Sequence, residues 1–366
     1  MLSAAELSRY ERQLALPEVG LTGQQRLQEA RVLIVGAGGL GSPAALYLAA
    51  AGVGVLGVVD DDAVEVSNLH RQILHGTADI GREKASSAAD AVQRLNPHVR
   101  VEAHRERLTA SRAESLFAGY DVVVDGSDNY TTRYAVNDAC ARLGKPWVYG
   151  SVERFSGQVS VFCAPGGPCY RCIFPDPPAP GSTANCEEIG VLGAVPGVVG
   201  SLQAVEAIKW ILDIGDLLAG RLLQLDFQTA NVHIVHFERR NDCAACSTQP
   251  LPEKSDDALD DMESPDIEPG DLAHRLPHAT FQLLDVRESW ELSIARIGQA
   301  RHTPMRDLPG SLDSLDRTQE LIVYCHTGVR SGMAAEWLRA QGFRARNLAG
   351  GIDRWSREVD PSVPRY

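Results

Sequence analysis

The stretch RVLIVGAGGLGSPAALYLAAAGVGVLGVVD, from Arg31 to Asp60, reads as one strand–turn–helix–strand unit. RVLIV is a β-branched run typical of a buried strand, GAGGLG is a turn, SPAALYLAAAG has the alanine content of a helix, and VLGVVD is a second strand. Because strands that alternate with helices pair in parallel, this unit predicts an α/β fold built on a parallel sheet.

The same alternation continues along the first domain. GREKASSAADAVQRLN has a helical pattern, VRVEAH is a strand, and YDVVVDGSDN is a strand that ends in polar residues, where an open α/β sheet binds its ligand. After KPWVYGSV come a short strand QVSVF, a proline-rich loop PDPPAPGSTAN, an apolar helix GVVGSLQAVEAIKWIL, and paired strands LLQLDF and VHIVHF. We expect this domain to span residues 1–246.

A second, smaller domain is expected after a linker. STQPLPEKSDDALDDMESPDIEP is acidic, contains prolines and is poor in large apolar residues, which indicates a solvated linker over 247–266. Beyond it, over 267–366, the strands FQLLDVR and ELIVYCH alternate with the helix GMAAEWLRAQG. This pattern predicts a small α/β domain that folds separately.

The bulk composition bounds the class of protein. The chain has 366 residues, 44% of them hydrophobic and 23% charged, which is typical of a soluble protein of two domains. We find no segment that approaches the ~20 apolar residues of a membrane span. The N-terminus MLSAAELSRYERQ has charges where a secretory signal has an apolar core, so a cytoplasmic location is expected. A net charge of -13 argues against nucleic acid as the main partner.

The glycine turn predicts a nucleotide site. GAGGLG fits G-x-G-x-x-G at Gly36, Gly38 and Gly41, and Asp60 ends the next strand. Alone, this fingerprint leaves nicotinamide or flavin binding about as plausible as another ligand. Arg71, in SNLHRQ, and Lys84 then add two cations, which suit a triphosphate with Mg²⁺ better than a diphosphate. The alternative for each cation taken singly is ordinary surface charge.

At this point the chain resembles the ThiF/MoeB family of ubiquitin-activating-enzyme-like adenylyltransferases, which implies a Rossmann-like, ATP-binding domain. The resemblance is carried by RYERQ (Arg9 to Gln13), GAGGLG, the strand end at Asp60, SNLHRQ (Ser67 to Gln72), Lys84, and DGSDN (Asp125 to Asn129). It covers nearly all of the first domain as an ordered set of motifs.

The resemblance also implies roles for individual residues. Gly39 and Asp60 would hold the nucleotide, Asp60 through the ribose hydroxyls, and Asp128 would lie near Mg²⁺. Arg12 would reach into the site of a dimer mate. Asn68, Arg71 and Lys84 would contact the phosphates. The residues expected around the nucleotide are Gly36, Gly38, Gly39, Gly41, Asp60, Ser67, Asn68, Leu69, His70, Arg71, Lys84, Asp128 and Asn129. The structural alternative for Asp128 is the N-cap of a helix.

Two C-x-x-C pairs predict a zinc site. CYRC provides Cys169 and Cys172, and CAAC provides Cys243 and Cys246. Four thiolates suit tetrahedral Zn²⁺ and leave no open position, so the metal would be structural. The pairs lie much farther apart than in a zinc ribbon, and the alternative is a redox dithiol. The adenylyltransferase family carries such a zinc.

Three other cysteines lie outside these motifs: Cys186 has two alternative roles, and Cys140 and Cys163 are expected to be buried. Cys186 lies in GSTANCEEIG, where the alternatives are an incidental loop thiol and, by resemblance to the family, a crossover-loop cysteine that holds the activated carrier covalently. Its acidic neighbours Glu187 and Glu188 would not favour a thiolate. Cys140 and Cys163 stand among apolar residues, which predicts buried packing.

The second domain contains a candidate sulfur site. CHTGVRS, from Cys325 to Ser331, follows a strand and precedes a helix, so converging amides, the helix N-terminus and Arg330 would favour a thiolate or persulfide. The alternative is an unreactive thiol at a strand end. This segment, LLDVRE and LAGGIDRW resemble the rhodanese family. Tyrosine phosphatases have a loop one residue longer. ARIGQARHTP departs from the histidine-glycine-alanine segment that rhodaneses often carry.

Together the two resemblances, as in MoeZ-type fusions, imply one reaction sequence. The C-terminal glycine of a small ubiquitin-like sulfur-carrier protein (MoaD/ThiS-like) is adenylated with ATP, and the Cys325 persulfide then converts it to a thiocarboxylate, with Cys186 completing sulfur release. A carboxylate is already nucleophilic, so this step needs positioning rather than a general base. The residues expected to act are Arg12, Arg71, Lys84, Asp128, Cys186, Cys325 and Arg330.

The expected partners and the rival functions follow. The resemblance implies a homodimer and a sulfur donor such as a cysteine desulfurase or thiosulfate, in molybdenum cofactor biosynthesis or in a related pathway such as tRNA thiolation, thiamine or cysteine synthesis. The rivals are an NAD-dependent oxidoreductase, which the glycine turn alone would allow, and a non-catalytic scaffold that binds carrier proteins.

Overall fold

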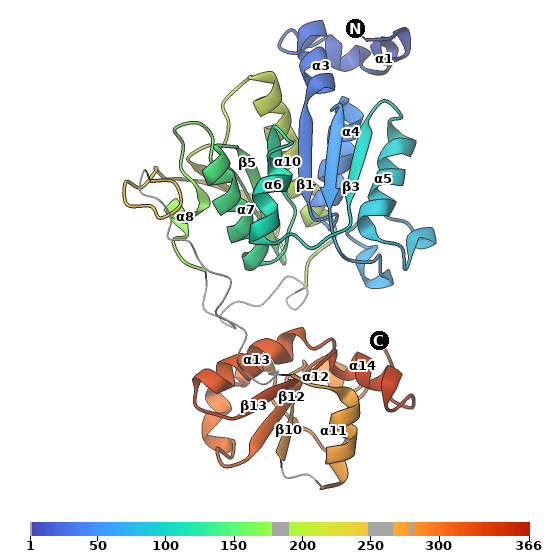
Figure 1. Ribbon diagram of the computed structural model, residues 1–366, viewed down its shortest axis with the longest axis vertical. Coiled ribbons are helices and arrows are strands. Elements are labelled where there is room, and N and C mark those ends of the chain that lie inside the picture. The colour runs from blue at the N-terminus through green and yellow to red at the C-terminus, as the bar shows by residue number, and fades with distance from the viewer. Residues whose placement is uncertain (1, 178–189, 248–265, 279–280) are drawn as a thin grey trace. The chain divides into compact units, whose positions relative to one another are not determined.

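The computed structural model describes residues 2–177, 190–247, 266–278 and 281–366. Its contacts divide the chain into two units, one before and one after the acidic segment (Figure 1). Each unit is an α/β structure with its own sheet, which confirms the predicted fold class. The predicted linker, 247–266, lies almost wholly outside the described residues, so its limits stay a prediction.

The first unit contains an eight-stranded sheet with the order β3-β2-β1-β4-β5-β6-β7-β8. Pairing is parallel from β3 to β5 and antiparallel from β5 to β8. The strands are β1 (Arg31–Val35), β2 (Val55–Val59), β3 (Arg100–His104), β4 (Val122–Asp125), β5 (Trp147–Glu153), β6 (Ser156–Phe162), β7 (Arg221–Asp226) and β8 (Asn231–His236). All strands expected from the sequence are present in this unit.

Helices cover both faces of this sheet (Figure 1). They are α1 (Ala4–Arg9), α2 (Glu11–Leu14), α3 (Gly20–Glu29), α4 (Gly41–Ala51), α5 (Lys84–Leu95), α6 (Ala110–Phe117), α7 (Tyr130–Leu143), α8 (Tyr170–Ile173) and α10 (Ala194–Leu212). Successive side chains of β1 point to opposite faces. Val32 and Ile34 therefore pack into the core with α3, α4, α5 and α10, and Leu33 and Val35 into the core with α6 and α7.

Helix α10 qualifies the expectation that no segment could span a membrane. Its 19 residues, with a mean hydropathy of 1.2, are long and apolar enough by length and composition. However, half of that stretch is buried inside the protein, and α10 packs on α4 and on strands β5 and β6. We therefore interpret α10 as a core helix.

The second unit contains a parallel sheet with the order β11-β10-β12-β13-β9. Its strands are β9 (Asp266–Ile267), β10 (Phe281–Asp285), β11 (Arg301–His302), β12 (Glu320–Tyr324) and β13 (Ala345–Leu348), and its helices are α11 (Pro269–Arg275), α12 (Ser289–Leu292), α13 (Val329–Ala340) and α14 (Gly351–Glu358). Leu272 of α11 and Trp355 of α14 share one core, and Leu338 of α13 lies in the other. The carboxyl end of β12 leads directly into the predicted sulfur loop.

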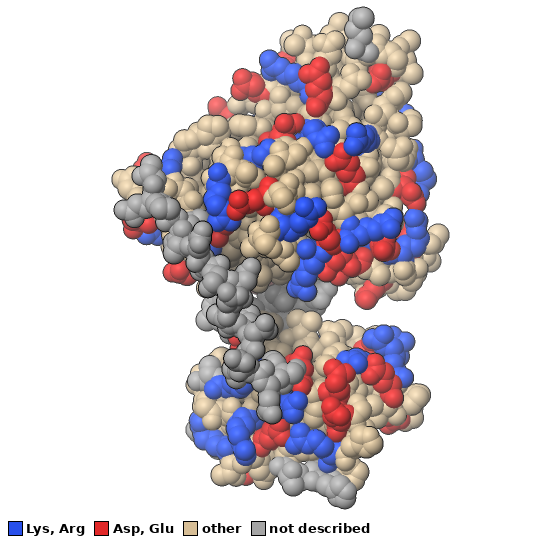
Figure 2. Space-filling model, viewed as in Figure 1, with Lys and Arg blue, Asp and Glu red and all other residues tan. Residues whose placement is uncertain are grey.

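Charges of both signs alternate on the face drawn in Figure 2, where Lys and Arg lie among Asp and Glu rather than in one basic field. That distribution agrees with the acidic net charge of -13.

Candidate active sites and metal centre

The glycine turn folds tightly between β1 and α4. Gly36 has a φ of +85°, and a Cβ at Gly41 would lie 1.9 Å from the Gly36 carbonyl oxygen, so no side chain fits at Gly41. By contrast, a Cβ at Gly38 would meet only Gln72 Nε2, at 3.8 Å. The turn therefore places the N-terminus of α4 and the open backbone at Gly38 where a phosphate could approach.

Asp60 connects the end of β2 to this turn. Its Oδ2 accepts a hydrogen bond from the Ala37 amide (2.7 Å), and its Oδ1 accepts one from the Asp62 amide (2.9 Å). Burial raises the pKa of Asp60. Each carboxylate oxygen has a second lone pair, so the side chain can also accept from a ribose hydroxyl.

Lys84 brings three of the predicted motifs together. It opens α5, is buried, and its Nζ lies 2.8 Å from Asp62 Oδ2. Burial disfavours the charge of Lys84, but the carboxylates of Asp60, Asp62 and Asp128 raise its pKa. The end of β2, the start of α5 and the DGSDN segment after β4 therefore meet around one cation.

Arg71 and Asn68 lie beside the glycine turn. The Arg71 guanidinium donates to Asn68 Oδ1 (3.1 Å) and to the Ser67 carbonyl (3.1 Å), which His70 Nδ1 also contacts at 3.0 Å. Leu69 is half-buried. A Cβ at Gly39 would lie 3.5 Å from Arg71 Cγ, so the arginine stem passes directly over the turn. Among the described residues, the Arg71 guanidinium contacts Ser67 and Asn68 and forms no ion pair with a carboxylate.

In the DGSDN segment, the residue that caps helix α7 is Asn129 and not Asp128. Asp128 is exposed, whereas the neighbouring Asn129 caps α7, its Oδ1 accepting the Thr132 amide at 2.8 Å. The idea that Asp128 is a helix N-cap is therefore wrong. Asn129 was expected at the nucleotide, but its side-chain oxygen accepts the capping hydrogen bond at the N-terminus of α7. Asp128 remains free to face Lys84.

Two residues of this site escaped the sequence analysis. His75 contacts the Ala37 carbonyl through Nε2 (3.0 Å) and Ser87 Oγ through Nδ1 (2.9 Å). Burial lowers the pKa of His75, which favours a neutral ring that donates from Nε2 to the turn. Gln72 approaches Gly38 and was quoted in SNLHRQ but given no role. A search for further polar residues just after that motif would have found His75.

These residues fit a nucleoside triphosphate. Gln72 Oε1 and Ser42 Oγ are buried without a hydrogen-bond partner among the described residues, and both lie at or next to the turn. The backbone at Gly38 is open, and Arg71 lacks a carboxylate partner. Ligand atoms of Asp60, Asp61 and Asp62 lie within 4.8 Å of one another, although exposed acidic groups alone do not establish a metal site. The donors and cations suit phosphate oxygens.

Arg12 is not brought to this site within the chain. It lies exposed on α2 and makes no ion pair in the part of the chain that the structure describes. This placement leaves its guanidinium available to another molecule.

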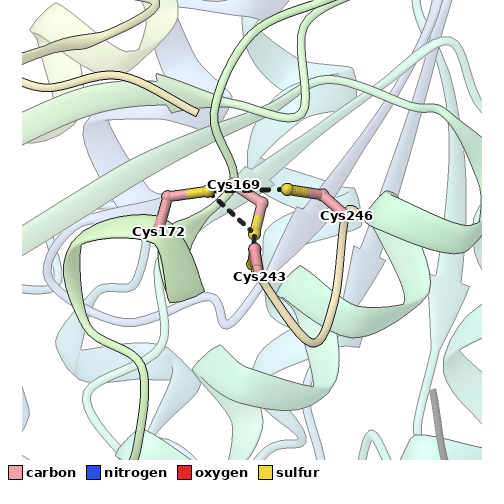
Figure 3. A group of neighbouring side chains, drawn as sticks. All are labelled: Cys169, Cys172, Cys243 and Cys246. Atoms are coloured by element: carbon pink, nitrogen blue, oxygen red, sulfur yellow. Dashed lines mark hydrogen bonds between the residues drawn. The ribbon is translucent and has the colours of Figure 1, made fainter. Parts of the chain in front are cut away.

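Four cysteines from two distant segments face one centre (Figure 3). Cys169 Sγ lies 3.9 Å from Cys172 Sγ and 3.5 Å from Cys243 Sγ, and Cys172 Sγ lies 3.5 Å from Cys246 Sγ. A tetrahedron of Zn–S bonds of about 2.3 Å separates its sulfurs by about 3.8 Å. The donor set therefore fits Zn²⁺, with all four positions filled by protein.

The surrounding structure supports a closed, structural centre. The buried Asn137 of α7 accepts the Tyr170 amide at 2.8 Å and so fixes the CYRC segment. The Arg240 amide donates to Cys172 Sγ at 3.5 Å. The predicted burial of Cys140 and Cys163 is confirmed, since both lie in the adjacent core. Cys186 lies outside the described residues.

In the second unit, Cys325 directly follows β12 and is fully buried. Its Sγ accepts a hydrogen bond from the Gly328 amide (3.1 Å), at the start of α13. Ser331 Oγ lies 3.3 Å from the same sulfur and 2.6 Å from Asn347 Oδ1, so its one proton is shared between these two acceptors. The LAGGIDRW turn packs on this loop so closely that a Cβ at Gly351 would lie 2.4 Å from the His326 carbonyl oxygen. Donors thus converge on the sulfur, as a thiolate or persulfide requires.

Arg330 was expected to favour a thiolate at Cys325, but in the structure it pairs with a carboxylate. Its guanidinium forms a bidentate ion pair with Glu291 of α12, with both N–O distances 2.6 Å. Part of its charge is therefore offset locally. Among the described residues, the Gly328 amide donates to Cys325 Sγ, and Ser331 Oγ lies 3.3 Å from it.

Comparisons with known proteins agree with this two-part organisation. The model of the ThiF family matches residues 10–246, and the model of the rhodanese-like domain matches residues 268–358. "Probable adenylyltransferase/sulfurtransferase MoeZ" of Mycobacterium tuberculosis is 42% identical over 379 residues, covering 100% of this chain and 96% of that protein. "Adenylyltransferase and sulfurtransferase MOCS3" of Drosophila grimshawi is 43% identical, covering 100% and 87%.

Solved structures show the same fold over about two thirds of the chain. The crystal structure of E. coli MccB superposes with a TM-score of 0.58 at 21% identity, covering 68% of this chain and 74% of that one. The E. coli MccB structure with ATP gives a TM-score of 0.57 at 21% identity, covering 65% and 74%. At this level of identity the likeness concerns the fold alone.

Proposed function

Because the chain belongs to the ThiF family and carries a rhodanese-like domain, we propose that this adenylyltransferase and sulfurtransferase acts on a small ubiquitin-like sulfur-carrier protein. It would convert the C-terminal glycine of the carrier to a thiocarboxylate. The observation that carries the proposal is the buried Lys84, which faces Asp60, Asp62 and Asp128 beside the glycine turn.

The first reaction is adenylation by ATP. The terminal carboxylate of the carrier attacks the α-phosphorus, a bond to that phosphorus forms, and pyrophosphate leaves. Lys84 and Arg71 neutralise charge on the phosphates, and Gly38 and Gly39 let the backbone approach them. Mg²⁺, when bound near Asp128, would supply further charge neutralisation at the pyrophosphate.

The second reaction transfers sulfur from Cys325. The terminal sulfur of its persulfide attacks the activated carbonyl carbon, AMP leaves, and the carrier becomes joined to Cys325 through an acyl disulfide. Attack by the Cys186 thiolate on Cys325 Sγ releases the carrier thiocarboxylate and leaves a Cys186–Cys325 disulfide. Two equivalents of a cellular thiol then reduce that disulfide to the Cys186 and Cys325 thiols and are themselves joined as a disulfide. The Gly328 amide donates to the Cys325 sulfur at 3.1 Å, and Ser331 Oγ lies 3.3 Å from it.

The proposed role of Arg12 requires a homodimer, because Arg12 would complete the nucleotide site of the partner subunit. Apolar side chains stand exposed on α4 and α10, which pack together: Tyr47 is 57% exposed, Val198 44% and Val205 49%. Burial of such side chains against a second copy would stabilise a dimer.

The sulfur source and pathway are further parts of the proposal. A cysteine desulfurase or thiosulfate would load Cys325 in the cytoplasm. The product would serve molybdenum cofactor biosynthesis or a related sulfur pathway, namely tRNA thiolation, thiamine synthesis or cysteine synthesis.

The test has two readouts on the full chain. Carrier-dependent exchange of pyrophosphate into ATP measures adenylation, and intact-mass analysis of the carrier after incubation with ATP, Mg²⁺ and a sulfur donor measures replacement of one oxygen by sulfur. Both are expected. Binding of NAD in preference to ATP would favour an oxidoreductase. Carrier binding without exchange would favour a scaffold, and either result would overturn the proposal.

A further inference from the structure

Tyr366 lies against the sulfur loop although it is distant from that loop in sequence. Its ring stacks on the ring of His326, the residue after Cys325, with centroids 4.3 Å apart and planes 11° apart. The exposed Trp290 ring contacts the Tyr366 ring in an edge-to-face arrangement, with the two ring centroids 6.0 Å apart. The Tyr366 ring therefore fixes the orientation of the first side chain that follows the reactive cysteine.

The Tyr366 hydroxyl joins two charged groups. It accepts a hydrogen bond from Arg287 Nη1 (2.7 Å) and donates one to Glu291 Oε1 (3.0 Å). Arg287 is fully buried and forms a bidentate pair with Asp285 at the end of β10, with contacts of 2.9 and 2.6 Å. The hydroxyl is thus anchored to a rigid part of the sheet.

Glu291 transmits this anchoring to the sulfur loop. Its two carboxylate oxygens hold Arg330 at 2.6 Å each, and Oε2 also accepts the Glu288 amide at 2.8 Å. Arg330 stands between the two residues that donate to Cys325 Sγ, Gly328 and Ser331. A change in the position of Arg330 therefore moves donors on both sides of it.

We propose that Tyr366 is a positioning residue for sulfur transfer, which acts through its hydroxyl on the Glu291–Arg330 pair and through its ring on His326. Neither group of Tyr366 touches the sulfur, so Tyr366 does not take part in the chemistry itself. Its two hydroxyl contacts hold the loop that receives a sulfur donor, and its ring presents the imidazole at the edge of that loop. The inference rests on Cys325 as the sulfur-carrying residue.

Among the residues of the sulfur loop, His326 depends most directly on Tyr366, because the two rings stack. Its Nε2 is buried without a hydrogen-bond partner among the described residues, and burial lowers the pKa of the ring. The Tyr366 stack determines where that nitrogen points.

The experiment measures sulfur transfer from thiosulfate to cyanide by the full chain. The Cys325 thiolate attacks the outer sulfur of thiosulfate, forming a persulfide and releasing sulfite, and cyanide then removes the outer sulfur as thiocyanate. The number of active Cys325 thiols is titrated as the sulfite released when thiosulfate is added without cyanide, a reaction that requires the folded site. Rates are expressed per thiol titrated in this way, so that a loss of folded protein does not affect them. The matched control is Arg365→Ala, which removes only the exposed contact of the neighbouring residue with Asp353.

Tyr366→Phe keeps the stack and removes the hydroxyl contacts. Because a hydrogen bond to a charged group is lost, we expect the KM for thiosulfate to rise about tenfold while kcat per titrated thiol changes less than about twofold. Tyr366→Leu, which also removes the stack, should raise KM further. Arg365→Ala should match the wild type. A KM for Tyr366→Phe equal to that of the control would overturn the proposal, as would a loss confined to the number of titratable thiols.

A double-mutant cycle tests the route through Glu291. In a Glu291→Gln background, Tyr366→Phe should add little further change in KM, because the same pair is already altered. Fully additive effects would sink the proposed route. If Glu291→Gln does not fold, the comparison of Tyr366→Phe with Arg365→Ala decides. Full transfer activity in Cys325→Ser would instead refute the proposed function, a result distinct from any effect at Tyr366.

Discussion

Lys84 Nζ lies 2.8 Å from Asp62 Oδ2, and the same ammonium group faces the carboxylates of Asp60 and Asp128. One buried cation therefore joins the end of β2, the start of α5 and the segment after β4. A triphosphate would bring additional negative charge to this point, so Lys84 must exchange carboxylate contacts for phosphate contacts as the nucleotide binds. That exchange makes Lys84 the most informative residue of the first site.

Lys84→Ala should abolish adenylation and spare sulfur loading. Loss of a preorganised charge at a phosphate typically costs on the order of a hundredfold or more in rate. Carrier-dependent pyrophosphate exchange should fall by at least that factor, whereas transfer from thiosulfate to cyanide should stay unchanged. Lys145→Ala, which removes backbone contacts of a lysine away from the turn, serves as the control. Unimpaired exchange in Lys84→Ala would count heavily against the site.

Cys325→Ala should have the opposite effect. The variant removes the sulfur that accepts from Gly328 and Ser331 and leaves the first unit untouched. Sulfur transfer and thiocarboxylate formation should disappear, and pyrophosphate exchange should remain at the wild-type rate. Loss of both activities would show that the two units do not function separately.

Cys243→Ser should remove zinc and destabilise the first unit. Because four thiolates would close the site, a zinc held there would contribute folding energy rather than chemistry. We expect metal analysis to find one zinc per chain in the wild type and none in the variant, with a melting temperature lower by several degrees. Cys140→Ala, a buried cysteine outside the cluster, should keep its zinc. A metal-free Cys243→Ser protein with unchanged stability would refute the structural role.

The Glu291–Arg330 pair predicts how acid affects the second unit. Burial opposes the charge on Glu291, but Arg330, the Glu288 amide and Tyr366 lower its pKa below the ordinary value of 4.5. A carboxylate with a lowered folded-state pKa contributes stability above its unfolded pKa, and this stability is lost as the pH falls through the folded-state pKa.

Pulse proteolysis in urea can measure this loss of stability, if the digestion is followed through peptides that come from residues 266–366. The free energy of unfolding of the wild type should decline as the pH falls from about 6 to about 3, and Glu291→Gln should decline less over that range. Glu358→Gln, which alters an exposed partner of Arg354, should decline like the wild type. Identical slopes for wild type and Glu291→Gln would contradict the assignment.

The sequence predicted those features that depend on local patterns. RVLIV and GAGGLG specify a strand and turn through neighbouring residues. The C-x-x-C pairs indicate candidate metal ligands through their chemistry, and Cys169 and Cys243 meet only in the folded chain. Contacts of single polar residues left no such pattern. His75 meets Ala37, and Tyr366 meets His326, only because the sheets bring distant segments together. The role of Asn129 as the cap of α7 needed backbone geometry to separate it from Asp128.

The proposed role of Arg12 in a partner subunit can be tested by mixing two inactive variants. Arg12→Ala lacks the arginine that would reach the other subunit, and Lys84→Ala lacks the lysine of its own site. Each homodimer should be inactive in pyrophosphate exchange. In a mixed dimer, however, the Arg12→Ala subunit keeps Lys84 and would receive Arg12 from its partner, so one of its two sites is intact. Random exchange of equal amounts should restore about a quarter of the wild-type activity. Arg9→Ala, which removes an exposed contact with the Leu95 carbonyl on the neighbouring helix, should remain active by itself. If the mixture stays as inactive as its components although mass analysis shows that mixed dimers have formed, then Arg12 acts within its own subunit or has no part in the site.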